Sequence, residues 1–261
     1  MCIRDSFSDA APGVFTNRET LYYLLALLNT KYANEIIKLI NPTLNFVPGA
    51  VSSVPVKKDE KNKGKIIEIA EGNVQLSERD WDSFETSWNF KKHPLLRNVS
   101  TISEAFNQWN TECDDRFNQL KANEEELNRI FIDIYGLQDE LSPEVEDKDV
   151  TVRKADLQRD IKSLLSYAVG CMFGRYSLDT EGLAYAGGEW DESKYKTFLP
   201  DVDGILPITD EEYLGDDIVT RLCSWLKAVY GEDTLEENLD FIAKALGGRG
   251  NSSREIIRNY F

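Results

Sequence analysis

The sequence has 261 residues, of which 41% are hydrophobic and 29% are charged, and its formal net charge is −16. These values are ordinary for a globular protein with a sizeable core. No apolar run reaches the roughly 20 residues that a membrane-spanning helix needs. No secretory signal is recognisable, so we expect a cytoplasmic protein without a membrane partner. Four scattered cysteines and a single histidine argue against a Cys/His metal site or a histidine-based triad.

The charge is distributed unevenly along the chain. Residues 1–100 carry a net charge of +1, residues 101–150 carry −10, and residues 151–261 carry −7. DNA binding depends largely on lysine and arginine side chains that neutralise phosphates. The first hundred residues are therefore the better candidate for DNA contact.

Both ends of the sequence have unusual features. Residues 1–6 read as a translated sequencing adapter, which we exclude from the fold prediction. Residues 252–261 read as a helix that has just begun, with Ser252 or Ser253 as its N-cap. We expect a truncated gene, and a genuine helical C-terminus is the alternative.

The first element is predicted to be one helix over residues 17–40. Thr16 to Glu19 form a capping box, and the apolar residues that follow keep helical spacing. Asn41-Pro42 ends the helix, because the residue before a proline avoids the helical region. Residues 44–56 are short, β-like and punctuated by prolines, which predicts a small β element.

A lysine-rich stretch follows that β element. It is read either as a solvated loop or as a phosphate-contacting segment, and the sequence leaves both open. A helix is predicted to start near Lys65, and a second one to start after an N-cap at Ser77. Four aromatic residues within 81–90 then lie beside two further lysines, and we favour core packing of these rings over base stacking. The candidate DNA-binding residues are Lys57, Lys58, Lys61, Lys63, Lys65, Lys91 and Lys92.

The second half of the sequence is predicted to be mostly helical. A near-straight apolar stripe over residues 101–136 predicts a long helix, roughly 50 Å at 1.5 Å per residue. Residues 141–154 read as an acidic linker, and residues 155–175 as a strong helix. Residues 179–207 are expected to be irregular. A capping box at Thr209 is predicted to open a helix to about 230, and Asp233 to cap a helix that ends at Gly247.

We recognise no catalytic motif in the sequence. Asn41-Pro42-Thr43-Leu44 lacks the second proline and the aromatic ring of the amino-methyltransferase motif, and we reject it. No Gly-x-Gly loop follows a strand, so no cradle for S-adenosylmethionine is recognised. The stretch from Asp201 to Gly204 is too short for a calcium loop and reads as a turn.

Several stretches resemble a known family. Residues 24–33, 80–88, 127–137 and 166–178 are similar to the adenine-specific DNA methyltransferases of BREX phage-defence systems, and the likeness runs from about residue 14 to the end. The residue after Gly49 departs from it, because the family usually has an acidic residue there. The resemblance implies that the whole protein methylates adenine N6 in double-stranded DNA with S-adenosylmethionine. It also implies that the methyl-transfer motifs lie upstream, so that no catalytic residue carries over and this fragment binds no cofactor.

We therefore expect a mostly helical α+β fragment that recognises DNA and acts as a scaffold within such an enzyme, with other defence-system proteins as further partners. The expected domains are the end of the methyltransferase domain with a target-recognition-like region (7–100), a spacer helix (101–140), the linker (141–154) and a truncated helical C-terminal domain (155–261). The alternatives are an acidic helical protein-interaction module or part of a fused type II restriction–modification enzyme. A DNA mimic is a more distant reading.

Overall fold

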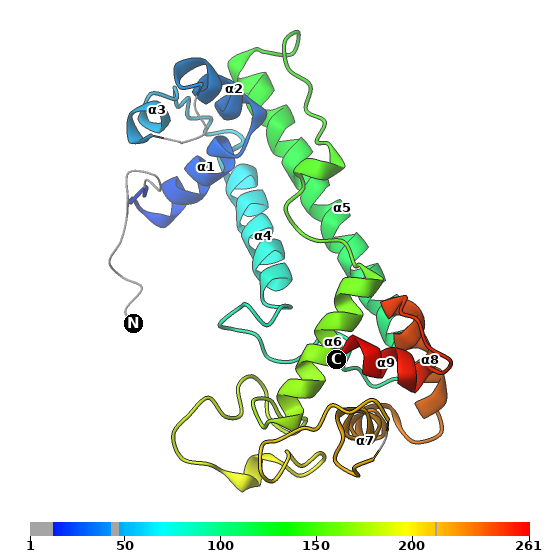
Figure 1. Ribbon diagram of the computed structural model, residues 1–261. Helices are drawn as coiled ribbons and strands as arrows, with labels where there is room; N and C mark the ends of the chain where they lie inside the picture. Colours follow the sequence, from blue (N-terminus) through cyan, green and yellow to red (C-terminus); the bar gives the residue numbers. More distant parts are fainter. Residues whose placement is uncertain (1–12, 43–46, 212) are drawn as a thin grey trace. The chain divides into compact units, whose positions relative to one another are not determined.

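The computed structural model describes residues 13–42, 47–211 and 213–261, and every regular element within them is helical (Figure 1). The longer helices are separated by turns and by one extended irregular stretch. In chain order they are α1 Arg18–Leu28, α2 Lys31–Ile40, α3 Pro48–Ser52, α4 Lys63–Trp81, α5 Ile102–Tyr135, α6 Leu157–Met172, α7 Ile218–Tyr230, α8 Leu235–Leu246 and α9 Ser253–Tyr260. Two 3-10 turns lie at Asp147–Asp149 and Glu192–Lys194.

The prediction of a small β element at residues 44–56 is wrong. Residues 43–46 lie outside the described part of the chain, and residues 48–52 form α3. Pro48 occupies the first turn of that helix, where its missing N–H costs nothing. Ala50 and Val51 both donate to the carbonyl of Val47, at 3.0 and 3.2 Å, so the backbone is satisfied locally without a partner strand. The described residues are therefore all-α, which corrects the α+β expectation.

The described chain forms two compact units, each assembled from two stretches of sequence. The first unit contains residues up to 78 together with 116–153, and the second contains 79–115 together with 154–261. Helix α5 contributes its N-terminal part to the second unit and its C-terminal part to the first. The expected division into consecutive domains stays a prediction.

The first unit begins with two helices where one was predicted. Asn29 ends α1, and its side-chain amide donates to the Leu25 carbonyl at 2.8 Å. Thr30 then caps α2 by accepting from the Ala33 N–H. The residue at the N-cap of α1 is Asn17, which accepts from the Thr20 N–H at 2.9 Å, and not Thr16. The polar side chains of asparagine and threonine compete well for backbone groups, so an Asn-Thr pair can interrupt a continuous apolar stripe.

Helix α4 begins two residues before the predicted start at Lys65 and continues through Ser77 to Trp81. Ser77 is exposed within this helix and is not an N-cap. The apolar side chains of α4 face the core of the unit, where Ile66 and Ala70 are buried with Leu27, Leu127 and Phe131. Because this packing stabilises α4 as one continuous helix, no new helix starts at Ser77.

The long helix expected over residues 101–136 is confirmed as the 34-residue α5. Apolar side chains along α5 pack into the cores of both units. Ile102 and Trp109 are buried in the core of the second unit, whereas Phe117 and Phe131 are buried in the first. The acidic stretch after α5 is not a bare linker, because Val150 and Val152 are buried against Phe117.

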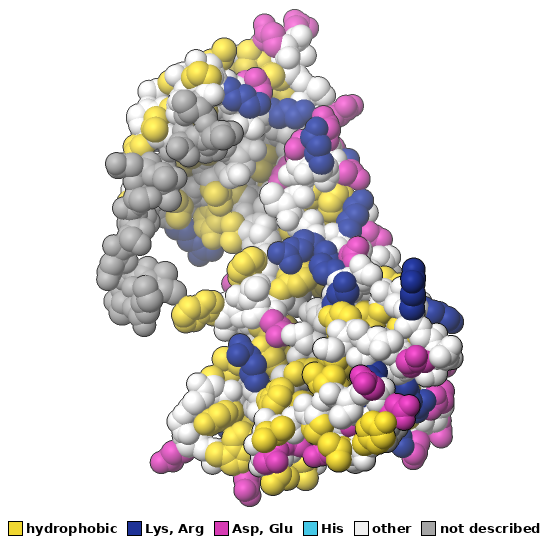
Figure 2. All heavy atoms as spheres, viewed as in Figure 1, with side chains coloured by type: hydrophobic (Ala, Val, Ile, Leu, Met, Phe, Trp, Pro, Cys, Tyr) yellow, Lys and Arg dark blue, Asp and Glu magenta, His cyan; other side chains and the backbone are white. Residues whose placement is uncertain are grey.

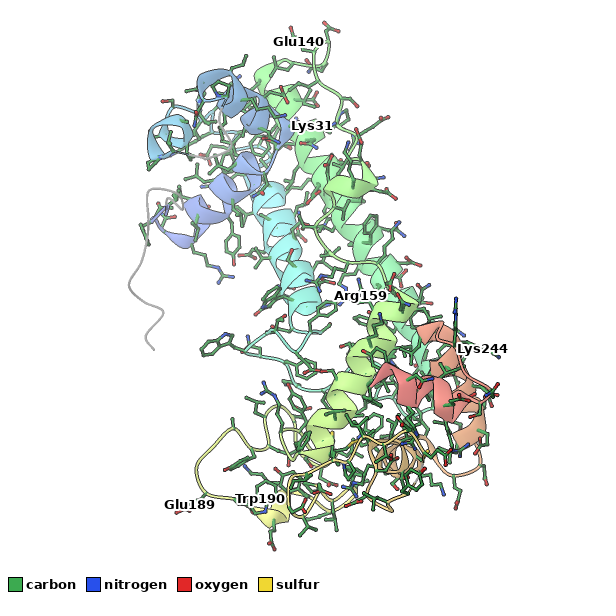
Figure 3. The ribbon with its side chains drawn as sticks, in the orientation of Figure 1. Lys31, Glu140, Arg159, Glu189, Trp190 and Lys244 are labelled. Carbon is green, nitrogen blue, oxygen red and sulfur yellow. The ribbon has the colours of Figure 1, made fainter. Side chains whose placement is uncertain are left out.

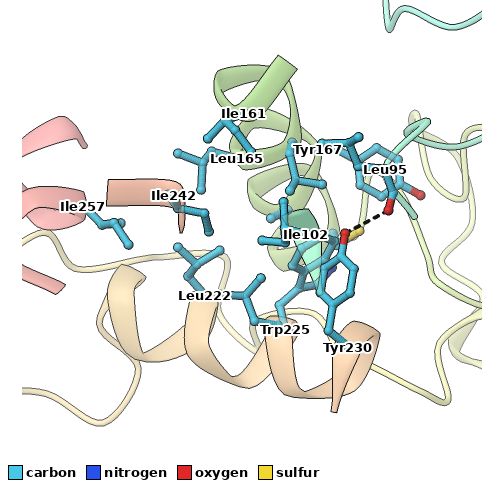
Figure 4. Close-up of a cluster of buried hydrophobic side chains, with 14 of the residues drawn as sticks. Leu95, Ile102, Ile161, Leu165, Tyr167, Leu222, Trp225, Tyr230, Ile242 and Ile257 are labelled. Carbon is cyan, nitrogen blue, oxygen red and sulfur yellow. Dashed lines mark hydrogen bonds between the residues drawn. The ribbon is translucent and has the colours of Figure 1, made fainter. Parts of the chain in front are cut away.

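The second unit has the larger core, which Figure 4 shows in part. Trp225 of α7 is fully buried there, and Tyr230 donates to the Leu95 carbonyl at 2.8 Å. The helix predicted over residues 155–175 is confirmed as α6, and the irregular nature of 179–207 is confirmed apart from its 3-10 turn.

Two predicted helix starts in the second unit need correction. Helix α7 begins at Ile218, and its cap is Asp217, not Thr209. Thr234, not Asp233, stands at the N-cap of α8. The end of α8 agrees with the prediction, since Gly247 adopts φ +67°, the left-handed conformation that glycine tolerates best.

Candidate nucleic-acid interface

The lysine-rich stretch at residues 57–65, which we call the lysine segment, is held to the first unit by tyrosines. The Tyr23 hydroxyl donates to the Lys57 carbonyl at 2.8 Å and accepts from the Asp59 N–H at 3.2 Å. The Tyr135 hydroxyl, at the end of α5, accepts from the Lys57 N–H at 2.8 Å and donates to the Pro55 carbonyl at 2.6 Å. The start of the lysine segment is therefore fixed to α1 and α5.

The turn that leads into α4 is organised by Asp59. Its carboxylate accepts from the Lys61 N–H at 3.0 Å and from the side-chain amide of Asn62 at 2.6 Å. The hydrogen bond from Asn62 lowers the pKa of Asp59 from its usual value. Helix α4 then starts at Lys63, so the last lysines of the segment lie in its first turn.

The five lysines of the segment differ in the partners of their ammonium groups. Lys63 pairs with Glu19 at 2.8 Å, and this hydrogen bond raises the pKa of Lys63. Lys65 pairs with Glu126 of α5, and that contact lowers the pKa of Glu126.

The Lys57 ammonium group donates to the Ile134 carbonyl at 2.8 Å. Lys58 and Lys61 are exposed, and neither has an ion pair among the described residues. The structure thus distinguishes these two lysines from the three that have partners.

The other two predicted lysines lie in the second unit, so the structure does not unite all seven in one site. Lys91 pairs with Glu181 at 3.3 Å, with both side chains exposed. Lys92 is exposed and has no ion pair within the residues that the structure describes.

The aromatic stretch before these lysines is divided between two environments. Phe90 is buried and makes edge contacts with Tyr167 and Tyr176, as the packing interpretation expected. Trp81 and Trp88 are 51% and 86% exposed. Sequence spacing could not separate these roles, because residues 82–101 form turns without a helical period.

Burial shifts the pKa values of two titratable side chains, His93 and Glu124, far from their usual values. His93 is buried, and burial lowers its pKa to about 3, so it is a neutral packing residue. Burial, together with the nearby charge of Asp149, raises the pKa of Glu124 to about 7. No sequence signal marked Glu124, which lies in an acidic run. The described residues contain no group of three His, Cys, Asp or Glu side chains that could hold a metal ion.

The chain resembles two curated proteins over nearly all of its length. It is 53% identical over 263 residues to the adenine-specific methyltransferase PglX of Lacticaseibacillus casei (strain Zhang), which covers 97% of this chain. It is 35% identical over 285 residues, again 97% of the chain, to the adenine-specific methyltransferase BrxX of Escherichia coli O9:H4 (strain HS). Over nearly its full length, this chain matches a segment of these two methyltransferases. The resemblance noted in the sequence is thereby confirmed.

The segment spans 22% of the length of PglX and 23% of the length of BrxX. No protein-family profile matches it. Within residues 13–42, 47–211 and 213–261, no helix is both long and apolar enough to cross a membrane.

Proposed function

We propose that this segment is the DNA-contacting and scaffold part of a site-specific adenine-N6 DNA methyltransferase of a BREX phage-defence system. The observation that carries the proposal is the 53% identity to PglX over 97% of the chain. Identity at that level over nearly the whole chain supports a shared fold and role for this region. Because the relatives are named adenine-specific methyltransferases, we propose duplex DNA as the partner.

We infer that the methyl donor, S-adenosylmethionine, binds the full-length enzyme outside these 261 residues. The described residues include no strand followed by a glycine-rich turn and a helix, which is the usual cradle for such a nucleoside. No chemical step is therefore assigned to any side chain of the segment. Its contribution would be to place DNA relative to the catalytic part.

The lysines are proposed to contact DNA phosphates through their side chains. Lys58, Lys61 and Lys92 should contribute most, because none of them has an ion pair among the described residues. Lys57, Lys63, Lys65 and Lys91 would have to exchange an existing partner for a phosphate, which reduces their net contribution.

The experiment measures duplex binding by the full-length enzyme at several salt concentrations. Each lost phosphate contact should reduce the slope of log K against log salt by about 0.9, so Lys58→Ala with Lys61→Ala should reduce it by about 1.8. Lys38→Ala is the matched control, since Lys38 is an exposed lysine of the same unit that pairs with Glu35 at 2.8 Å. An unchanged slope in the double variant would show that Lys58 and Lys61 do not contact DNA phosphates, which would overturn the proposed placement of DNA.

A second candidate function rests on the acidic surface. Residues 101–150 carry a net charge of −10, and phosphate repulsion makes such a surface a poor DNA ligand. We propose that it binds a protein partner within the same defence system, which is compatible with DNA contact elsewhere on the chain.

A further inference from the structure

The irregular stretch between α6 and α7 exposes an unusual amount of apolar surface. We call residues 173–214 the acidic–apolar segment. Nine of the 21 large hydrophobic side chains that are exposed in the described part of the chain lie within it. Val202 is fully exposed, and Leu199, Ile205 and Tyr213 are each more than 60% exposed. Exposed apolar surface of this kind commonly marks a site of interaction with another molecule.

The exposure is fixed by the way the backbone is anchored. The Asp201 N–H donates to the Met172 carbonyl at 2.7 Å, and the Arg258 guanidinium donates to the Thr209 carbonyl at 2.9 Å. Leu206 turns inward and packs on the core of the second unit. With the backbone held at these points, Val202 and Ile205 stay exposed within the described chain.

The segment is mostly negative, with ten acidic residues against Arg175, Lys194 and Lys196. Between residues 199 and 217 the sequence has seven acidic residues and no lysine or arginine, and between 176 and 193 it has five acidic residues and no base. Of the described acidic residues in the first of these ranges, Asp217 alone has an ion pair, with Arg258. In Figure 2 hydrophobic and acidic side chains lie side by side on this part of the molecule.

Trp190 offers a place for a cation within the segment. Its ring stacks on Tyr195 with centroids 4.8 Å apart, and Tyr185 packs edge-on at 5.2 Å, yet Trp190 is 45% exposed. Glu189 and Asp191 flank it in the chain, and Figure 3 labels Glu189 and Trp190 on the outer loops. An exposed aromatic ring whose neighbours in the chain are acidic suits an arginine guanidinium, which stacks and pairs at once.

We propose that the acidic–apolar segment docks a protein segment whose apolar side chains are flanked by arginine or lysine. The apolar side chains of the partner would contact Val202 and Ile205, and a guanidinium would lie on Trp190. The negative charge of the segment excludes DNA as the occupant. This inference does not depend on DNA binding by the lysine segment.

The test uses the full-length protein and three fluorescent helical peptides. The first peptide has leucine on one face and arginine on the other, the second replaces arginine with glutamate, and the third replaces leucine with serine. Fluorescence anisotropy should show the leucine–arginine peptide binding at least about tenfold more tightly than the other two. Equal binding of the three peptides would overturn the proposal.

Substitutions locate the binding to the segment. Val202→Ser and Trp190→Ala should each weaken the leucine–arginine peptide about tenfold. Leu39→Ser and Trp88→Ala are matched controls, because Leu39 is 80% and Trp88 is 86% exposed elsewhere on the chain. If Val202→Ser binds as tightly as Leu39→Ser, the surface is not the docking site. Duplex binding by Val202→Ser should keep its salt slope, which separates this result from failure of the proposed function.

Discussion

At the scale of single residues, the buried pair of Asp217 and Arg258 joins the start of α7 to α9. Asp217 is fully buried, and its carboxylate accepts from the N–H groups of Val219 and Thr220 at 3.0 and 3.1 Å. Burial alone would raise the pKa of Asp217, but the hydrogen bonds from Arg258 and the α7 backbone outweigh it, so the pKa is lowered. The pair closes the irregular stretch onto the helices of the second unit.

Removing one partner of this pair should destabilise the fold strongly. Arg258→Met leaves the Asp217 charge buried without its cation, and we expect a loss of about 3–5 kcal/mol in urea unfolding at pH 7. The pH dependence follows from the lowered pKa, since stability from Asp217 is present above its unfolded value of 3.8 and is lost as pH falls below it. The difference between wild type and variant should therefore shrink in acid. A loss below about 1 kcal/mol would contradict the structure.

At the scale of elements, the approach of α6 to the following turn depends on a glycine. A Cβ added at Gly170 would lie 2.6 Å from the ring of Tyr176. That ring stacks on Tyr167 with centroids 4.7 Å apart and is buried, so it has little room to move. Gly170 and Gly174 lie four residues apart in the sequence, but glycine is needed at the two positions for different reasons. Gly170 allows the close contact with Tyr176, whereas Gly174 lies beyond the end of α6 and adopts φ +74°.

Gly170→Ala should destabilise the protein although alanine favours helices. We expect a net loss of about 1–3 kcal/mol from overpacking against Tyr176, measured by thermal or urea unfolding. Gly72→Ala in α4 is the matched control, because its nearest neighbouring atom would lie 4.0 Å away on Asn123. That control should gain about 0.5–1 kcal/mol from helix propensity. Equal effects of the two substitutions would argue against the close contact.

At the scale of the whole molecule, the compact units are not continuous in sequence. The second unit draws Leu95, Ile102 and Trp109 from before the acidic stretch and α6 to α9 from after it. The Trp109 ring N–H donates to the buried carboxylate of Asp160 at 3.0 Å, which ties the two parts together. The expected C-terminal domain of residues 155–261 lacks this first part.

Residues 154–261 alone should therefore fail to pack, since the core would lose several large side chains and Asp160 would lose the hydrogen bond from Trp109. We expect dye binding and a weak near-ultraviolet signal, as in a molten globule. A permuted chain that links residues 79–115 to the end of 154–261 should restore cooperative unfolding. Cooperative folding of 154–261 by itself would instead support the sequence-predicted domain.

The amino-acid sequence was enough to predict the resemblance to the methyltransferases, most helices and the long α5, because these depend on local periodicity, capping and long stretches of similar residues. It could not exclude a strand at residues 44–56 or place the break at Asn29-Thr30, since short segments depend on the partners that they find. Only the tertiary structure showed that Lys63 and Lys65 pair with glutamates while Lys58 and Lys61 do not. It also showed that most large apolar side chains between Leu199 and Leu214 stay exposed, whereas Leu206 packs on the core. Both depend on contacts between residues distant in sequence, which no spacing along the chain records.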